Sequence, residues 1–576
     1  MKIKKITIHN FRSILHQELN LNDYSLLIGE NNAGKSNIFR AIRVFYEDEK
    51  FNASTDFPKI GTTDKESWIE IEYITNQTEQ EGLKDEYKSK DNILRVRKIL
   101  HSTADKDLVK STQSNIYAYE NGQLSKNLFY GAKNISQSKL GSVIFIPELS
   151  KVDETLKLSG PSPLRSMINF VVKKAVENSD SYAELNEAFS AFNEKFRKES
   201  SDGFSIHTLT ENINAEMSDW NVRVGIDINS LKSEELVKSL VSHYVEDGNL
   251  DNQRVNIDSF GQGLQRHLVY SLIKLSAEYA ETKQALKKEF APNFNLILFE
   301  EPEAFLHPTQ QQKMNLNLEK LSSNDDTQLL ITTHSPIFVS QNIDKLTSLI
   351  RVRRESDTKL FQLNKPVMDN LFDSNTGLYQ LCKATLEDPS SSDAIKNEIK
   401  KSKLASVNDD LEIKIQEESF RYSLWIDSER SSSFFSKCVI ICEGASEKVF
   451  LDLLIKTEWA DLSNNNIYII DVMGKFNIHR FMNLFGKLGI SHSILLDSDN
   501  DRNVHELINN FIENSKNSFT KNIHWFDSDL EGFLGIETPG RKDLKPLNIM
   551  SKYHNKEIDP EKIKALKQII TDLIQD

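Results

Sequence analysis

The chain has 576 residues, of which 38% are hydrophobic and 27% are charged, and its formal net charge is −14. This length exceeds what one hydrophobic core organises, so we expect about three or four folding units. The negative charge argues against a protein that coats nucleic acid by bulk electrostatics. It does not exclude a local basic channel, because carboxylates that hold a metal ion are neutralised by that ion.

Membrane and secretory classes are also disfavoured. No apolar run approaches the roughly 18 residues that cross a bilayer, and the opening residues lack the pattern of a secretory signal, so we expect a cytoplasmic protein with no membrane partner. Cys382, Cys438 and Cys442 are an odd set without zinc-ligand spacing, and we interpret them as core residues.

The N-terminal residues predict a nucleotide-binding loop. Residues 24–46 read as a buried strand, a Gly-rich turn and a helix, and Gly29–Ser36 fits G-x-x-x-x-G-K-[ST]. In such a loop Lys35 reaches the β and γ oxygens of a nucleotide, and Ser36 supplies a magnesium ligand. We predict that the remaining nucleotide contacts of this segment come from Asn31, Asn32, Gly34 and Asn37.

The pattern becomes helical from Pro161 to about Trp220. Apolar residues recur there at steps of three and four, which predicts one stripe on a helix: Leu185, Ala188, Phe189, Phe192 and Phe196. Because strand-like segments precede and follow this region, we interpret it as a helical insert between two α/β portions.

The strand pattern returns at 221–228, and further buried strands are expected at 294–299 and from Thr327. The second of these ends in Glu300 and Glu301, which predicts one carboxylate near magnesium and another that orients a water molecule. His334 follows the last strand and is a candidate contact to the γ-phosphate. A solvated pair of acids and a structural histidine are the alternatives.

A polar stretch from about 386 to 436 suggests a linker, and three short apolar strands separated by helical segments follow it. Glu443 ends the first of them and Glu447 lies one helical turn later, while Asp497 and Asp499 end the third. Carboxylates at neighbouring strand ends suit two divalent ions about 3.5–4 Å apart, which assist phosphodiester cleavage. Taken singly, each motif also fits a solvated loop or an acidic helix start.

The N-terminal motifs, in their order, resemble the ABC-type ATPases of the SMC, RecF and OLD (overcoming lysogenization defect) group: NFRS, GENNAGKSN, SFGQGLQR, FEEPEAFLHP and TTHSP. The resemblance implies a dimer in which the signature residues Gly261, Gly263 and Gln265 of one protomer cap ATP held by the other. Gly261 stands where the family usually has serine and Leu264 follows Gly263, which removes a hydroxyl for the γ-phosphate and predicts slow hydrolysis.

The C-terminal pattern, EGxxE followed by DxD, resembles the Toprim domain, and behind an ABC-type ATPase it resembles the OLD family. The resemblance implies metal-binding roles for Glu443, Glu447, Asp497 and Asp499. It adds Glu531 as a later metal ligand and Lys545 as a catalytic lysine. Residues with expected supporting or DNA-facing roles are Lys475, Ser498 and Asp501.

The sequence therefore predicts an α/β protein in which an ABC-type P-loop ATPase with a helical dimerisation insert precedes a Toprim domain. The expected boundaries are 1–155 and 221–365 for the ATPase, 156–220 for the insert, 366–430 for a linker with helix, and 431–576 for the Toprim unit. We expect a DNA endonuclease that uses ATP and Mg²⁺ or Mn²⁺, with Glu301, Glu443, Asp497 and Lys545 catalytic, and with Ser36 and Glu300 binding the metal at the nucleotide.

The resemblance implies an anti-phage setting and a homodimer or higher oligomer. It also implies a separate partner, such as a reverse transcriptase with its RNA–DNA product or another defence-system protein. Two alternatives remain open: a RecF- or SMC-like DNA-repair ATPase whose Toprim unit only binds DNA, and a nucleotide-driven DNA clamp in which the acids are merely solvated.

Overall fold

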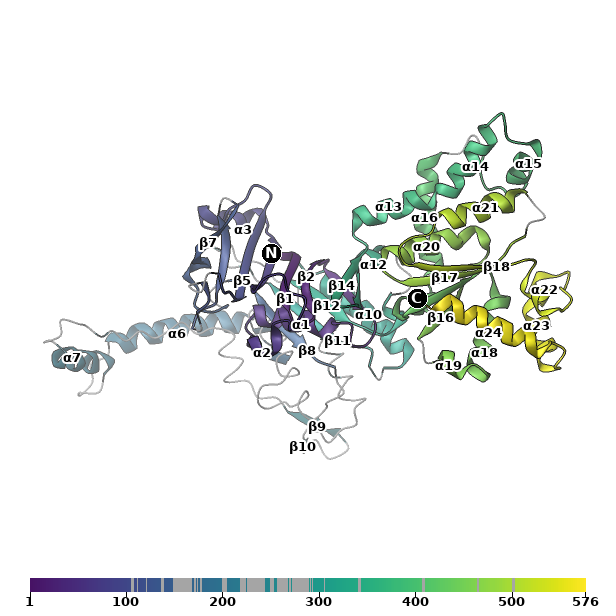
Figure 1. Cartoon of the computed structure of the whole chain (residues 1–576). Helices are drawn as coiled ribbons and strands as arrows, with labels where there is room; N and C mark the ends of the chain where they lie inside the picture. Colours follow the sequence, from purple (N-terminus) through teal and green to yellow (C-terminus); the bar gives the residue numbers. More distant parts are fainter. Residues whose placement is uncertain are drawn as a thin grey trace.

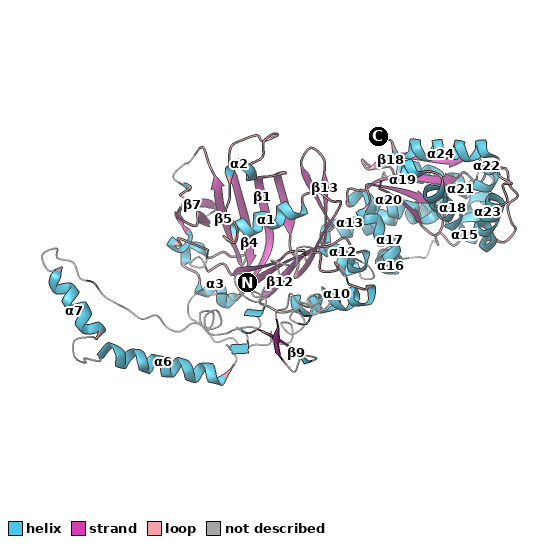
Figure 2. Cartoon of the chain, turned by 90° about the horizontal axis from the view of Figure 1, so that it is seen from below, coloured by secondary structure: helices cyan, strands magenta, loops and turns pink. Residues whose placement is uncertain are grey.

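A computed structural model shows an N-terminal body, a helical arm on one side of it and a C-terminal α/β unit on the other (Figures 1 and 2). It describes residues 1–104, 108–110, 112–120, 122–135, 139–148, 168–169, 172, 175–176, 179–198, 205–217, 224, 244–248, 253–255, 268, 271, 290, 292, 294–304, 306–339, 343–406, 410–463, 466–499 and 503–575.

The alternating pattern at the N-terminus forms an antiparallel sheet. Its strand order within the described residues is β2-β1-β4-β5-β6-β7. Most apolar residues of β1 and β4 are buried, and these pack in one core with helix α1 (Lys35–Phe45). The strands of this sheet are β1 (Lys2–Phe11), β2 (Ile14–Asn20), β4 (Ser67–Ile74), β5 (Ile93–His101), β6 (Ile116–Glu120) and β7 (Gln123–Leu128), and its short helices are α2 (Ala53–Asp56) and α3 (Gln77–Gly82).

A second, mostly parallel sheet carries the nucleotide loop and has the order β14-β13-β3-β12-β11-β8 in the described part of the chain. Only β14 runs antiparallel to its neighbour. The strands are β3 (Tyr24–Ile28), β8 (Ser142–Ile146), β11 (Asn295–Glu300), β12 (Thr327–Thr332), β13 (Leu349–Arg354) and β14 (Thr358–Gln362), and the helices that follow β11 and β12 are α10 (Pro308–Ser322), α11 (Pro336–Val339) and α12 (Ile343–Ser348). The buried strands expected at 294–299 and from Thr327 are thus present as β11 and β12.

The helical arm contains α6 (Asp180–Lys198) and α7 (Ile206–Glu216), which project from the N-terminal body (Figure 1). On α6 the rings of Phe192 and Phe196 are stacked with centroids 5.3 Å apart, as the three- and four-residue spacing predicts. Phe192 nevertheless remains 51% exposed. Two short strands, β9 (Val245–Asp247) and β10 (Gln253–Val255), pair with each other farther along the chain, and the strand expected at 221–228 lies outside the described residues except for position 224.

The C-terminal unit has a parallel sheet with the order β16-β15-β17-β18 among the described residues. Its strands are β15 (Cys438–Cys442), β16 (Ile467–Asp471), β17 (Ser491–Asp497) and β18 (Thr520–Phe526). Its helices are α18 (Ala445–Thr457), α19 (Ala460–Ser463), α20 (Ile478–Lys487), α21 (Asn503–Asn514), α22 (Leu530–Leu534), α23 (Lys545–His554) and α24 (Pro560–Ile574).

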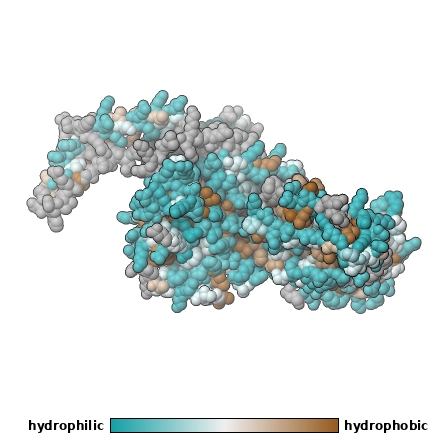
Figure 3. Space-filling view, turned by 90° about the horizontal axis from the view of Figure 1, so that it is seen from above, coloured by the Kyte–Doolittle hydropathy of each residue, from teal (hydrophilic) through white to brown (hydrophobic). Residues whose placement is uncertain are grey.

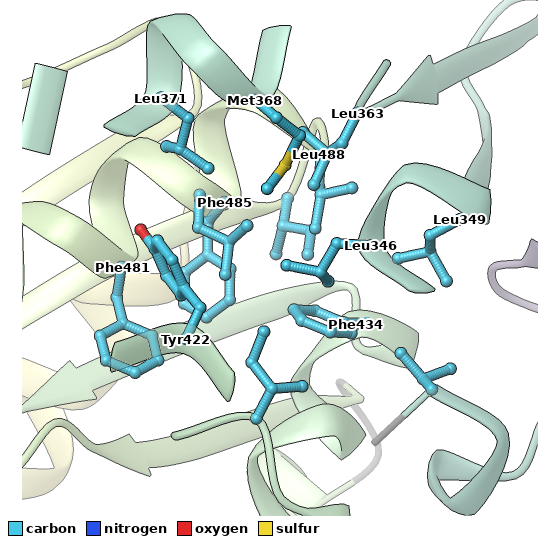
Figure 4. Close-up of a cluster of buried hydrophobic side chains, with 14 of the residues drawn as sticks. Leu346, Leu349, Leu363, Met368, Leu371, Tyr422, Phe434, Phe481, Phe485 and Leu488 are labelled. Atoms are coloured by element: carbon cyan, nitrogen blue, oxygen red, sulfur yellow. The ribbon is translucent and has the colours of Figure 1, made fainter. Parts of the chain in front are cut away.

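The region expected to be a linker with helix contains helices that pack together as a layer. Tyr422 of α16 is buried with Leu371 of α13 and Phe481 of α20 in one cluster that also includes residues of the second, mostly parallel sheet (Figure 4). The sequence conceals this because the buried residues are few and the exposed faces are strongly polar. The helices of the layer are α13 (Lys365–Asn375), α14 (Gly377–Glu387), α15 (Asp393–Lys401), α16 (Leu411–Trp425) and α17 (Ser428–Ser431).

The surface is mainly hydrophilic, with small separate hydrophobic patches on the face shown in Figure 3. Among the helices that the structure describes, none is both long enough and apolar enough to cross a membrane.

Candidate functional site

The nucleotide loop connects β3 to α1, and its shape requires two glycines. Gly29 has a φ of +140°, and a Cβ atom there would lie 2.1 Å from the carbonyl oxygen of Val352. Gly34 has a φ of +113°, and its Cβ would lie 2.5 Å from Oγ1 of Thr358. A side chain at Gly29 would therefore clash with the backbone of β13, and one at Gly34 with the side chain of Thr358 on β14, so the loop motif is linked to the packing of the sheet.

Lys35 points into this loop. Its Nζ donates to the carbonyl oxygens of Gly29 at 2.8 Å and Glu30 at 3.0 Å. Burial lowers the pKa of Lys35 to about 8, although nearby glutamates favour its charged form. Asn31, Asn32 and Ser36 are exposed at the mouth of the loop, where a nucleotide has access to them.

Asn37 has a bracing position. Its amide nitrogen donates to Oγ of Ser13 at 2.7 Å, and its Oδ1 accepts from Arg12 at 3.3 Å. Ser13 in turn shares a 2.7 Å hydrogen bond with Thr358, whose hydroxyl donates to the carbonyl of Ala33. Residues of the NFRS segment therefore hold the loop in place through hydrogen bonds. In this arrangement the Asn37 side chain points toward Arg12 and Ser13.

Glu300 and Glu301 end β11 beside the loop. Burial raises the pKa of Glu300, while a backbone hydrogen bond from Glu148 and a side-chain hydrogen bond from Ser36 oppose this effect. Burial raises the pKa of Glu301 to about 7, and the charge of Glu148 adds to it. The hydroxyl of Ser36 and the carboxylate of Glu300 thus meet where the loop motif predicts a shared magnesium ion.

His334 lies against the second of these acids. Its Nε2 is 3.4 Å from Oε1 of Glu301, and burial lowers the pKa of His334 to about 4. Because the imidazole is neutral at pH 7, this contact is not an ion pair. Glu303 fixes the backbone around the histidine, accepting from the amides of His334 at 2.6 Å and Ser335 at 3.1 Å.

A cleft of about 610 Å³ opens beside these residues and is lined by Glu301, Glu303, His334 and, from α17 of the helical layer, Ser428. The predicted signature residues Gly261, Gly263 and Gln265 lie outside the described residues, and so does Asp501.

The C-terminal acids meet at one edge of the parallel sheet. Cys442, the last residue of β15, is paired in register with Leu495 of β17. Glu443 and Asp497 therefore leave adjacent strands at the same end, and Glu447 follows on the first turn of α18. Burial is the largest cause that raises the pKa of Asp497, which is about 8. The negative charges of four neighbouring carboxylates add to it: Glu447, Glu443, Asp499 and Asp529.

A lysine and two further acids complete this edge. Nζ of Lys545 lies 3.1 Å from Oδ2 of Asp529 and 3.5 Å from Oε2 of Glu531. Burial alone would lower the pKa of Lys545, but the hydrogen bond to Asp529 and the charges of Glu531 and Asp497 raise it above its usual value. Lys545 is therefore protonated at neutral pH and faces the acids.

The residues at this edge fit a divalent cation. Glu531 is 1% exposed, and its Oε1 atom is buried without a hydrogen-bond partner. Burial, followed by the charges of Glu443 and Glu531, raises the pKa of Glu447 to about 7. A bound cation would relieve both the unpaired oxygen and the mutual repulsion. Within the described part of the chain, no three His, Cys, Asp or Glu side chains are already arranged around one metal-ion position.

Comparison with known proteins identifies the two parts of the chain. Residues 1–339, more than half of the chain, match the AAA ATPase domain family, and residues 434–499 match the TOPRIM domain of proteins like the overcoming lysogenization defect protein. The chain belongs to the AAA ATPase domain family. With its OLD-like TOPRIM domain it is an OLD-type ATPase–TOPRIM protein, which confirms the resemblance carried by the motifs. These two domains imply the use of ATP and of a divalent metal.

Relatives of this OLD-type protein are distant but extend over most of its length. It is 24% identical over 525 residues to the endonuclease GajA of Bacillus cereus (strain VD045), covering 87% of this chain and 75% of GajA. It is 23% identical over 511 residues to the Old nuclease of Escherichia phage P2, covering 87% of this chain and 77% of that protein. An SMC head bound to the C-winged helix domain of ScpA aligns with 63% of this chain and 98% of its own at 13% identity and a TM-score of 0.37.

Three residues of the two sites are absent from the sequence predictions. Glu148 follows β8, the strand beside β11, and Glu303 lies in the same EEPEAF segment as the predicted pair. Asp529 caps α22, accepting from the amide of Gly532 at 2.9 Å, and also binds Lys545. An acid just after a buried strand is the available signal for Glu148, whereas Asp529 resembles an ordinary helix cap.

Proposed function

We propose that this OLD-type protein is a DNA endonuclease that depends on Mg²⁺ or Mn²⁺ and is controlled by ATP bound to its ATPase part. The observation that carries the proposal is the meeting of Glu443 and Glu447 with Asp497 at adjacent ends of β15 and β17, opposite a protonated Lys545. The relatives named endonuclease and nuclease support the same activity.

At the nuclease edge we assign metal binding to five carboxylates: Glu443, Glu447, Asp497, Asp499 and Glu531. Bound divalent ions would stabilise the attacking and leaving oxygens of a phosphodiester displacement. We assign catalytic roles to Glu443 and Asp497, which face the reacting phosphate, and to Lys545, whose ammonium group offsets negative charge that develops on it.

At the ATPase site Lys35 binds the β and γ phosphates, with Asn31, Asn32 and Gly34 along the loop. Ser36 and Glu300 bind the nucleotide's magnesium, and Glu301 orients a water molecule. His334 approaches the γ-phosphate through Nε2. A second copy of the chain supplies Gly261, Gly263 and Gln265 over the nucleotide, and the insert at 156–220 helps to hold the dimer together.

We extend the proposal to anti-phage defence in the cytoplasm, with a separate partner such as a reverse transcriptase carrying its RNA–DNA product. The support for this extension is the OLD-type combination of domains.

The test is nicking of supercoiled plasmid by the full-length protein with Mg²⁺ or Mn²⁺, with and without ATP, and with excess chelator. We expect Glu447→Gln and Asp497→Asn each to abolish nicking, while Asp461→Asn, which alters an exposed ion pair with Lys567, leaves it intact. ATP binding, measured with a fluorescent analogue, should be equal in all four proteins. Undiminished nicking by a Glu447→Gln/Asp497→Asn double variant would refute the site. DNA binding that depends on ATP, without cleavage by the wild type, would favour the clamp alternative.

A further inference from the structure

The loop between β16 and α20 crosses the edge of the sheet that carries the acids. Two of its backbone amides bond to the end of β15: Val472 donates to the carbonyl of Cys442 at 3.2 Å, and Gly474 donates to the carbonyl of Glu443 at 2.8 Å. Asn477 closes the loop by donating to the carbonyl of Val472 at 2.9 Å. The loop is therefore attached to the strand end that presents Glu443.

Lys475 extends from this loop to the end of the next strand. Its Nζ donates to the carbonyl of Asp497 at 2.6 Å and to that of Ser498 at 3.3 Å, and it lies 3.3 Å from Oδ2 of Asp499. The residue is 2% exposed. Strand β15 lies between β16 and β17. Lys475, which follows β16, thus reaches across the end of β15 to the end of β17.

The turn that Lys475 contacts has an unusual backbone. Asp499 has a φ of +46°, in the left-handed region that costs energy for a residue with a side chain. Its carboxylate is also 3.2 Å from Nδ1 of His505, on the first turn of α21. Because a charged donor binds two successive carbonyls and the following carboxylate, it stabilises this turn and fixes the direction of the Asp499 side chain.

We propose that Lys475 is a positioning residue that sets the separation of Glu443 from Asp497 and Asp499, and so determines how tightly the nuclease edge binds divalent metal. This inference rests on the proposed nuclease function. Lys475 acts through the strand ends and does not contact the substrate. Residues that orient metal ligands in this way typically alter metal affinity about 10- to 100-fold when they are removed.

The first measurement is Mn²⁺ binding by the full-length protein, followed through the electron paramagnetic resonance signal of the free ion. Lys475→Met keeps the length of the side chain but removes its charge and its donors, and should weaken binding at the nuclease edge about 10- to 100-fold. Lys475→Arg retains a charge that can reach the same carbonyls and should restore part of the affinity. The matched control is Lys487→Met, which changes an exposed lysine on α20 whose Nζ donates to Oδ1 of Asn370.

The second measurement is plasmid nicking over a range of Mn²⁺ concentrations. The metal concentration for half-maximal nicking should rise for Lys475→Met by the same factor as the binding constant, and high Mn²⁺ should recover most of the rate. ATP binding should match that of the wild type. If Lys475→Met fails to fold, Lys475→Gln, which keeps a donor without a charge, replaces it with the same expected direction.

The outcomes separate the two proposals. Metal binding and metal dependence equal to those of the wild type would overturn the role of Lys475 and leave the nuclease function standing. A lower melting temperature with unchanged metal dependence would make Lys475 a structural residue only, and would also overturn the inference. Absence of nicking by the wild type at every metal concentration would instead refute the proposed function.

Discussion

At Lys545, neighbouring carboxylates outweigh the effect of burial on the pKa and keep the side chain charged. It begins α23 and is held by Asp529 and Glu531, so its ammonium group has a fixed position despite a long, flexible side chain. A lysine that remains protonated beside several carboxylates is suited to offset charge on a phosphate. Asp529 performs two tasks at once, since it caps α22 and anchors this lysine.

Replacing this lysine gives a prediction at the scale of one residue. Lys545→Met should lower the rate of plasmid nicking at saturating metal by about 10²- to 10³-fold, because a preorganised donor to the developing charge is lost. Lys545→Arg should recover part of the rate, and Lys552→Met, on the same helix, should have little effect. Single-turnover nicking would measure this, and a Lys545→Met rate within twofold of the wild type would contradict the assigned role.

At the scale of elements, the C-terminal unit buries two histidines on the consecutive elements α20 and β17. His479 on α20 bonds through Nε2 to the carbonyl of Asn375, and His492 on β17 bonds to Ile490 and Thr520. Burial lowers the pKa of His479 to about 3 and that of His492 to about 4. Both side chains are therefore neutral in the folded protein, where they serve as hydrogen-bonded core residues.

This burial predicts a pH dependence of stability. A histidine in the unfolded chain has a pKa near 6.5 and is protonated below that pH. His492 in the folded protein stays neutral until about pH 4. Stability is therefore lost as the pH falls through this window, by about 2 kcal/mol at pH 5 for this one group. Chemical unfolding at pH 7 and pH 5 should show a smaller pH effect in His492→Gln than in the wild type, by that amount.

The control for this experiment is His554→Gln, which changes an exposed histidine at the end of α23 and should leave the pH effect unaltered. An equal pH effect in His492→Gln and the wild type would show that the pKa of His492 is the same in the folded and the unfolded protein.

At the scale of the whole molecule, the ATPase and the C-terminal unit are joined by a buried arginine. Arg351 of β13 is 2% exposed, and its guanidinium donates to the carbonyls of Gly489 at 2.8 Å, Ser436 at 3.1 Å and Phe434 at 3.2 Å. Beside it lies the shared apolar cluster of Figure 4. A single strand of the nucleotide-binding sheet thus holds two loops of the C-terminal unit.

A second connection runs through α17. This short helix packs against α11, which directly follows His334 and Ser335. On its other side Arg430 lies 3.2 Å from the carboxylate of Asp471, the last residue of β16, and Glu429 lies 3.0 Å from Nζ of Lys448. The helix after His334 and Ser335 therefore contacts α17, which in turn contacts β16 and α18 of the C-terminal unit.

The arginine joint gives the prediction for the whole molecule. Arg351→Met would leave several buried carbonyls without a donor, at about 1–3 kcal/mol each, and should lower stability by at least about 3 kcal/mol. Calorimetry should then resolve separate transitions for the ATPase and the C-terminal unit. Arg354→Met, an exposed neighbour on the same strand, should unfold like the wild type. A single unshifted transition for Arg351→Met would disprove the joint.

The sequence by itself determined the class of both sites. The nucleotide loop, the acids after β11 and the EGxxE and DxD pairs each occupy a strand end followed by a turn, and that local pattern is readable because the residues which form it are close in the chain. The buried strands were predictable for the same reason, since a short apolar run between breakers specifies them without reference to the rest of the fold.

Only the tertiary structure decided what surrounds those residues. The contact of Lys475 with Asp497, the anchoring of Lys545 by Asp529 and the burial of Arg351 all depend on the strand order β16-β15-β17-β18 and on how the two units pack. The polar stretch before β15 became a helical layer because a few residues such as Tyr422 find partners far away in the chain. Such contacts leave no periodic trace in the sequence, because their energy comes from pairing with groups that no local pattern identifies.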